Sequence, residues 1–446
     1  MAGLLQNIDL PGADIPWLEG MREKGRTEYE RQGLPTAKTE AWKYTRPRDL
    51  QADDFVMEHH CLCRENGHGH ECGCGEECHC HEAASDILPF PAYELHFQNG
   101  ILQHSHLRLP RGVTVMPLME AVLAADEIKS YLGKAVDLEN YPLAALNTAY
   151  LNEGVFINIA RDTVLDKPIA LVYHTACGTD NLFYNLRNVI SLENGASATI
   201  VEYHRYSGAE KSRYFANIVN EIFLGRETSL QHYKLQDEAY KAVHVALSAV
   251  KVRGGGKYQS FCLQRGANLA RNETKVQLRE ENAHAQADAA YLMNGWATID
   301  TTTNIEHLAP ETYSDQLVKG VVGGDAKGVF QGKIHIAPGA VKTEGKQLHK
   351  AVLLTDTAEI DCKPELEIFA DDVKCSHGAA SGELDEEQLF YMRSRGIGEE
   401  EAKQILIDAY LEDVLGRIPD ESIRAWLAEN ARQDCHSERS RRISAN

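Results

Sequence analysis

LEIFADDVKCSHGAASGELDEEQLFYMRSRG, residues 366–396, is the stretch in which two kinds of secondary structure meet. Residues 366–369 are mostly apolar and typical of a strand, whereas the acidic residues 385–388 open a segment that predicts a helix. Cys375 and His377 lie between them. A thiol and an imidazole two residues apart can reach the same metal ion when the backbone is extended or turning. Both groups bind iron or zinc. The stretch therefore predicts a metal-handling motif where a β region ends.

Upstream of this stretch, residues 88–375 have the pattern of a β protein. Short runs such as 154–160 and 198–203 are separated by the turn residues Gly, Asn and Asp. Four segments place a small turn before a small residue and an alternating strand: ENGASATI (193–200), GRETSLQH (225–232), EENAHAQA (280–287) and TDTAEIDC (355–362). This irregular echo fits a stacked β-coil in which each rung buries its face on the next. The pattern alone also permits a β-sandwich.

Helical patterns flank the β region on both sides. Residues 14–50 carry apolar side chains such as Leu18 at helical spacing, and we interpret Trp42 as packing of this segment onto the core. Residues 383–430 predict two helices separated by the glycines of 396–398. The second of these helices has an apolar stripe made of Ile405, Leu406, Ala409, Tyr410, Val414 and Leu415.

The C-terminal motif ADDVKCSHGAASGELDEEQLFYMRSRGI (370–397) resembles the signature of the SufB/SufD family of the SUF iron–sulfur cluster assembly system. The resemblance extends over nearly the whole chain, through GLPTAKTEAWKYT (33–45), LNTAYLNEGVFINI (146–159), HYKLQDE (232–238) and GVFQGKIHIAPGA (328–340). It implies a mainly β fold with a right-handed parallel β-helix core, flanked by N-terminal and C-terminal helical segments.

Two positions favour the SufD branch of this family over the SufB branch. SufB-type chains carry a Glu directly after the His of the motif, where this chain has Gly378. They also carry a Cys in the upstream strand, where this chain reads Gln347-Leu348-His349. The resemblance then implies a non-catalytic scaffold subunit with a transient iron–sulfur cluster shared with SufB.

The resemblance also implies partners and a site. A SufC-type ATPase would dock on the C-terminal helices, 383–418, and a SufB-type paralogue, or a second copy in a homodimer, would pair through the β-helix edge. In the family, the His of this motif lies at the contact with SufB. His377 is therefore the first candidate for cluster binding and Cys375 the weaker one, because a cysteine at a strand end is usually a small buried hydrophobe.

Residues 57–82, MEHHCLCRENGHGHECGCGEECHCHE, differ in composition from the rest of the chain. They interleave soft and borderline metal ligands without apolar periodicity, which predicts a flexible loop that binds zinc or another divalent metal. Its candidate ligands are Cys61, Cys63, Cys72, Cys74, Cys78, Cys80, His68, His70, His79 and His81. The alternative function is therefore metal buffering or metal chaperoning through this insert. A low-complexity insertion without a selected role is the structural alternative.

Composition excludes several functions. A net charge of −20 and a pI near 5.4 argue against nucleic-acid binding and against anionic membranes. The remaining five cysteines are scattered singly, which indicates reduced thiols, and we expect a cytoplasmic protein. No GxxxxGK[ST] motif is present, so no nucleotide site of that kind is expected. A polysaccharide-cleaving β-helix enzyme would usually be secreted, which counts against that class.

Other polar groups are interpreted as structural. His307 is expected to be a hydrogen-bonded histidine on the coil surface, and Arg187 and Arg271 are expected to be ladder or turn residues. The predicted domain organisation is an N-terminal helical region (1–56), a Cys/His-rich insert (57–87), a β-helix core (88–380), a C-terminal helical domain (381–432) and a disordered tail (433–446).

Overall fold

The computed structural model describes residues 10–45, 47–50, 55–57, 87–103, 107–124, 126–176, 181–207 and 213–432. Its helices are α1 (Pro16–Gln32), η1 (Glu40–Trp42), η2 (Pro47–Leu50), α2 (Leu118–Ala124), η5 (Asp126–Ser130), α3 (Pro142–Ala149), α4 (Glu386–Ser394), α5 (Glu399–Leu415) and α6 (Glu421–Arg432). No helix in the described part of the chain is long and apolar enough to cross a bilayer.

The strands form two ten-stranded sheets. One sheet contains β4 (Val113–Pro117), β5 (Val155–Ile159), β7 (Leu182–Leu192), β9 (Tyr214–Leu224), β11 (Val243–Val252), β13 (Leu269–Leu278), β15 (Thr298–His307), β17 (Lys327–Ile336), β19 (Glu359–Ile368) and the short β1 (Val56–Met57). The other contains β3 (Ile101–Leu102), β2 (Tyr93–Gln98), β6 (Ile169–Ala176), β8 (Ser197–Ser207), β10 (Ser229–Glu238), β12 (Lys257–Gly266), β14 (His284–Met293), β16 (Tyr313–Val322), β18 (Glu344–Leu353) and β20 (Lys374–Glu383).

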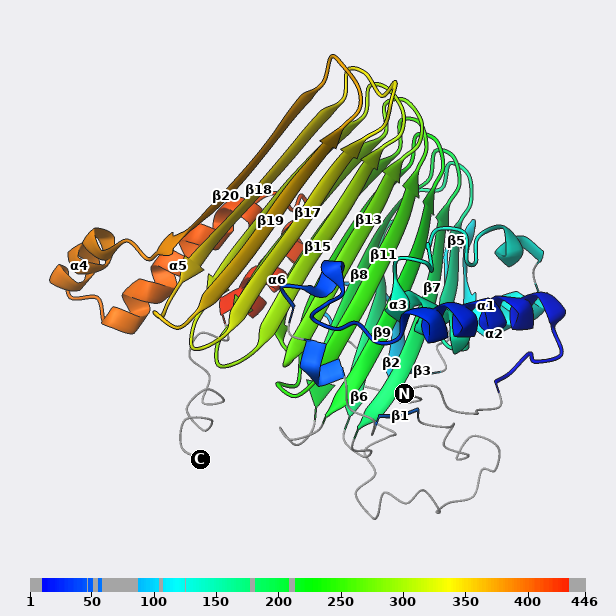
Figure 1. The fold of residues 1–446 in the computed structure, drawn as a ribbon, viewed down its shortest axis with the longest axis horizontal. Coiled ribbons are helices and arrows are strands. Elements are labelled where there is room, and N and C mark those ends of the chain that lie inside the picture. The colour runs from blue at the N-terminus through cyan, green and yellow to red at the C-terminus, as the bar shows by residue number, and fades with distance from the viewer. Residues whose placement is uncertain are drawn as a thin grey trace, which may run out of the picture.

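The chain alternates between the two sheets, so that each turn of the coil adds one strand to each (Figure 1). From β5 onward every ladder within a sheet is parallel; for example, Ser229 pairs with Ser197 on one side and with Lys257 on the other. Side-chain hydrogen bonds between neighbouring rungs join residues 27 to 32 positions apart. A continuous apolar core, including Ile200, Ile218 and Leu230, lies between the sheets. The prediction of a mainly β fold with a parallel β-helix core and flanking helices is confirmed.

Most of the similar turn-and-strand segments noted in the sequence form a stack of turns at one corner of the coil. Gly195, Glu227, Gly255 and Asn282 all have positive φ, and each lies in the turn before a strand of the β8 sheet. Their N–H groups donate to carbonyls of the next turn, as in Gly195 N to Arg226 O (2.9 Å) and Glu227 N to Gly254 O (2.9 Å). Three of the four predicted segments belong to this stack. The fourth, 355–362, leads into β19 of the other sheet.

Helices interrupt the region that the sequence predicts as β throughout. Residues 118–149 contain α2, η5 and α3, so the prediction is wrong there. All eight residues of α3 are buried, which removes the amphipathic period that would reveal a helix. Helix α1 crosses α3 closely, since a Cβ on Gly25 would lie 2.5 Å from the backbone N of Ala149. Trp42 is 3 % exposed, which confirms its predicted packing.

The C-terminal segment forms three helices rather than the predicted two, because α6 follows α5. Asp385 caps α4 by accepting hydrogen bonds from two backbone N–H groups. The predicted stripe of α5 is partly wrong: Ile405 and Ala409 are exposed, whereas Ile407 and Leu411 are buried. The buried stripe packs with α6 against apolar side chains on the outer face of the β8–β20 sheet. In Figure 1, α4 instead projects away from the coil, and none of its residues is buried.

Candidate functional site

The coil ends in an open rung made of β19 and β20. In the described sheets, β19 pairs only with β17 and β20 only with β18. Almost every residue of β20 is exposed, whereas β18 alternates between buried and exposed side chains. Strands with one unpaired side present free backbone N–H and C=O groups. This open rung is therefore a surface that could accept another strand.

The predicted site residues lie on β20 and share one of its faces. Cys375 packs with the apolar cluster around Ile334 and Ile336, so its side chain points into the coil. Because side chains two residues apart share a face of a strand, His377 is on the same inner side. It pairs in register with Gln347, which is 2 % exposed, yet His377 itself is exposed because no further rung covers it. The open end thus displays an imidazole that an internal rung would bury.

The thiols at this end are protonated in the free chain. Burial raises the pKa of Cys375, against the effect of a backbone hydrogen bond from Gly345. Cys362 lies on β19 next to the interior core, and burial raises the pKa of its thiol to about 11. The sequence analysis treated Cys362 only as a scattered cysteine. Cys362 lies an even number of positions from the apolar residues Ile360 and Leu366, so the sequence itself places the three side chains on one face of the strand.

The open end does not assemble a complete metal site by itself. Among the residues that the structure describes, one group of three or more His, Cys, Asp and Glu side chains is close enough to share an ion, and it consists of His204, Glu238 and His244. Cys375 and His377 are not part of such a group. All ten candidate ligands of the insert, from Cys61 to His81, lie outside the described residues.

Apolar side chains surround the open end. Ile368 and Phe369, where β19 ends, are 42 % and 59 % exposed. On α4, Phe390 and Tyr391 are 74 % and 59 % exposed. Because Ile368 and Phe369 come just before β20 and α4 follows its far end, these exposed apolar side chains flank the open rung at both ends of β20.

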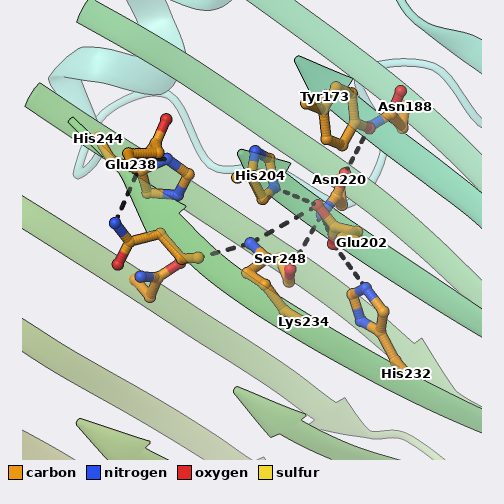
Figure 2. Close-up of polar contacts among 12 residues, drawn as sticks. Tyr173, Asn188, Glu202, His204, Asn220, His232, Lys234, Glu238, His244 and Ser248 are labelled. Carbon is orange, nitrogen blue, oxygen red and sulfur yellow. Dashed lines mark hydrogen bonds and ion pairs between the residues drawn. The ribbon is translucent and has the colours of Figure 1, made fainter. Parts of the chain in front are cut away.

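The interior contains a second polar constellation that the sequence analysis did not find (Figure 2). Glu202 is fully buried; its Oε1 accepts hydrogen bonds from His232 Nε2 (2.6 Å) and Asn220 Nδ2 (2.8 Å). Its Oε2 lies 3.2 Å from His204 Nε2 and 3.6 Å from Lys234 Nζ. Burial opposes ionisation, but Lys234 and the two imidazoles lower the pKa of Glu202 well below its ordinary value. Glu202 is thus a carboxylate held inside the coil.

The same constellation continues across neighbouring rungs. Asn220 accepts a hydrogen bond from Asn188 Nδ2 (2.8 Å), which also contacts the hydroxyl of Tyr173 (2.8 Å). On the other side, Lys234 and His232 border an internal cavity of about 40 Å³. A cavity of that size holds roughly three water molecules, which suits the polar groups that line it.

The polar interior was missed because the usual alternation is reversed here. In HYKLQDE (232–238), Tyr233 and Leu235 pack on the outside beneath the C-terminal helices, whereas His232, Lys234 and Gln236 point into the coil and are buried. A period of two assigns residues to two faces without saying which face meets water. Only the position of α5 and α6 settles it.

Comparisons with known proteins agree with this architecture. Residues 175–410 match the family described as "SUF system FeS cluster assembly, SufBD core domain", and residues 10–171 match the "SufBD protein N-terminal region". An iron–sulfur cluster assembly SufBD family protein of Synechocystis is 29% identical over 408 residues, covering 89% of this chain and 86% of the relative. The iron–sulfur cluster assembly protein SufD of Escherichia coli is 29% identical over 402 residues, covering 88% of each chain. SufD of Bacillus subtilis is 26% identical over 324 residues, covering 71% of this chain and 72% of the relative.

Proposed function

This chain belongs to the SufBD family of iron–sulfur cluster assembly proteins, and from that premise we propose that it is a non-catalytic scaffold subunit of the SUF complex. It would pair with a SufB-type paralogue through β19 and β20 and work with a SufC-type ATPase. The observation that carries this proposal is the open rung. Its two strands, β19 and β20, each have one edge without a neighbouring strand in the described sheets, and the residues of β20 are mostly exposed. The nascent cluster is cargo that would pass through the contact between the two scaffold chains.

The chemistry of the open rung supports a shared cluster site. His377 offers a ligand nitrogen at an accessible position, whereas the raised pKa of Cys375 and Cys362 keeps those thiols neutral until a metal replaces the proton. A partner rung that stacks on β20 would enclose His377 and bring its own groups to the same inner face. The site would then be completed only in the complex.

The apolar side chains of α4 are the best candidates for the ATPase dock. The predicted dock covers residues 383–418, but part of the predicted apolar stripe of α5 is already buried against the coil, at Val414 and Leu415. The buried residues of this stripe cannot anchor a partner, and the dock itself stays a prediction. Phe390 and Tyr391 remain exposed on α4 and can fill an apolar pocket of the partner.

Ala379→Lys is expected to weaken binding of the SufB-type paralogue about tenfold or more, because a stacked rung would bury an unpaired ammonium group. Ala379 is exposed on the inner side of β20, in register with the buried His349, so the free chain accommodates the change. Co-purification after co-expression of the three proteins measures the effect. Ala380→Lys is the matched control on the outer side of the same strand, in register with Lys350. Equal losses in both variants, or none in either, would rule out pairing through this edge.

His377→Ala is expected to slow cluster formation on the reconstituted complex by about a factor of ten, as for the loss of a group that supports a metal site. The melting temperature should not change, because the side chain is exposed. Ser376→Ala, one residue away on the outer side, serves as the control. Wild-type rates of assembly in the variant would sink the assignment, and a large drop in melting temperature would indicate a structural histidine instead.

The Cys/His-rich segment 57–82 supports a second candidate function, metal buffering or delivery. It contains more soft and borderline ligands than the four that one tetrahedral site needs. Deleting 57–82 is expected to remove more than one equivalent of exchangeable zinc per chain without changing the rate of cluster assembly. Zinc titration of the full chain and of the deletion variant measures the difference. Equal uptake by both would assign the metal to other residues and return the segment to low-complexity sequence.

A further inference from the structure

Three ligand-type side chains meet inside the coil, away from the open rung. His204 lies on β8, Glu238 ends β10 and His244 lies near the start of β11. One ligand atom from each lies within 4.8 Å of the other two, and all three residues are buried. In the sheet that contains β10, four strands separate it from β20, so this group is not part of the partner surface.

Three ring nitrogens of this group lack hydrogen-bond partners among the described residues. His204 Nδ1 has none, and neither ring nitrogen of His244 has one, although both rings are 0 % exposed. Nδ1 of His244 lies 2.9 Å from Oε2 of Glu238 without the alignment of a hydrogen bond. The amide Oε1 of Gln236 is also unpartnered, and its Nε2 lies 3.3 Å from the same carboxylate oxygen. Several orphaned buried atoms at one place indicate a missing ligand, because each would otherwise cost free energy.

The network behind His204 orients its ring for metal binding. Its Nε2 hydrogen-bonds the Glu202 carboxylate (3.2 Å), so in the neutral ring the proton is on Nε2 and Nδ1 has the free lone pair. In Figure 2, His204 lies between Glu202 on one side and Glu238 with His244 on the other. A carboxylate behind a histidine is the usual support of a metal ligand.

The charge of the interior also suits a cation. Lys234 Nζ lies 3.6 Å from the Glu202 carboxylate and so is the cation next to Glu202. Among the described residues, the Glu238 carboxylate has no lysine or arginine next to it and lies beside the imidazole of His244. A fully buried carboxylate without a formal positive partner is costly unless a cation neutralises it.

We propose that His204, Glu238 and His244 bind one divalent cation of borderline softness, Zn²⁺ or Fe²⁺, inside the β-helix. Two imidazoles and one carboxylate are a known ligand set for both ions. Metal–ligand bonds of about 2.0–2.1 Å place tetrahedral ligand atoms roughly 3.3 Å apart. Here Nδ1 of His244 and Oε2 of Glu238 are 2.9 Å apart, and all three ligand atoms lie within 4.8 Å of one another. Gln236 Oε1 or a water molecule would take the fourth position. The site ties β8, β10 and β11 together across both sheets.

The test uses the full chain expressed in media supplemented with Zn²⁺, Fe²⁺ or Co²⁺ and then dialysed against a chelator. Ions on exposed ligands exchange into the chelator, whereas a fully buried ion should remain. We expect one equivalent of metal per chain by elemental analysis, and the supplement that fills the site identifies the preferred ion. The retained Co²⁺ should show the visible spectrum of nitrogen and oxygen ligands, without the near-ultraviolet charge-transfer band of a thiolate.

Variants assign the retained ion to these residues. Glu238→Gln keeps the size of the side chain but removes the anionic ligand, so this variant should not retain the metal ion. His244→Gln should not retain it either. His307→Gln is the matched control, because it removes a fully buried imidazole elsewhere in the coil and should keep the ion. Retention of the ion by both cluster variants would overturn the proposal. So would a wild-type chain that retains no metal from any of the three media, a result that does not depend on whether the variants fold.

Discussion

Asp300→Ala is expected to lower the free energy of unfolding by about 3–5 kcal/mol, the cost of breaking a buried ion pair. Asp300 is fully buried on β15, and its Oδ2 accepts hydrogen bonds from Arg271, from Thr45 of the N-terminal segment and from Gln331 (3.1 Å). Arg271 also lies 4.4 Å from the ring centre of Trp42. Removal of the carboxylate leaves the guanidinium with Glu273 as its one charged partner among the described residues and removes the hydrogen bond that Thr45 of the N-terminal segment donates to the coil.

Urea denaturation of the wild type and of Asp300→Ala, monitored by tryptophan fluorescence, measures this loss of stability. The matched control is Lys363→Ala, which breaks another link between the N-terminal segment and the same sheet, the Lys363–Glu40 pair (3.3 Å). Because that pair is exposed, its removal should cost about 0.5 kcal/mol. Similar small losses in both variants would mean that apolar packing, and not the buried pair, holds the N-terminal segment.

Local sequence patterns favoured a stacked coil but left a β-sandwich open, and the family resemblance decided between the two; neither predicted the helices within residues 118–149. The turns at 193–200, 225–232 and 280–287 recur because each corner needs a residue with positive φ whose N–H bonds to the next turn. Such local requirements leave a visible trace in a sequence. Helix α3 leaves none, because a helix buried on all sides has no polar face.

The interior site was hidden for a related reason. Glu202, His204, His232 and Lys234 alternate with apolar residues, as the outward-facing residues of any half-buried strand would. Helices α5 and α6 cover the outer face of their sheet, so the apolar residues face outward and the polar ones face inward. Which face is covered depends on residues roughly 200 positions away in the chain, and no local period contains that information.

At the open rung, the motif identified the residues but not their setting. Cys375 and His377 were expected on an extended or turning backbone, and they lie on β20 with a shared inner face. Nothing in their own sequence shows that the next rung is missing. His307 was expected to be hydrogen-bonded, which is confirmed, but it is fully buried rather than on the surface. Its strand is paired with β13 and β17 on its two edges, and its ring is buried against Thr312 and Ser314.

Acid is expected to destabilise the coil through two buried histidines, by about 3 kcal/mol each between pH 6.5 and pH 4. Burial lowers the pKa of His307 to about 4, with a further contribution from the nearby His335, and burial lowers the pKa of His349 to about 4. His307 shares hydrogen bonds of 2.8 Å with Thr312 and Ser314 in its neutral form. His349 Nε2 lies 2.8 Å from the hydroxyl of Tyr291, and its ring stacks on Phe330.

The direction of the effect follows from the two states of each imidazole. Above pH 6.5 the histidine is neutral in both the folded and the unfolded chain, so the full stability is present. As the pH falls below 6.5, the unfolded chain binds a proton that the folded chain refuses, and stability declines until the pH reaches the folded pKa near 4. Urea denaturation at a series of pH values should therefore show a steep acid limb in the wild-type chain.

Substitution of these histidines separates their contribution to the acid loss of stability from that of the carboxylates. His307→Gln with His349→Gln should flatten the decline between pH 6.5 and pH 4 by about 6 kcal/mol, even though the double variant is less stable at pH 7. His377→Ala removes an exposed imidazole and should leave the curve unchanged. If the double variant and the wild type lose stability in parallel, the two histidines already bind protons in the folded chain, and the acid sensitivity belongs to other groups.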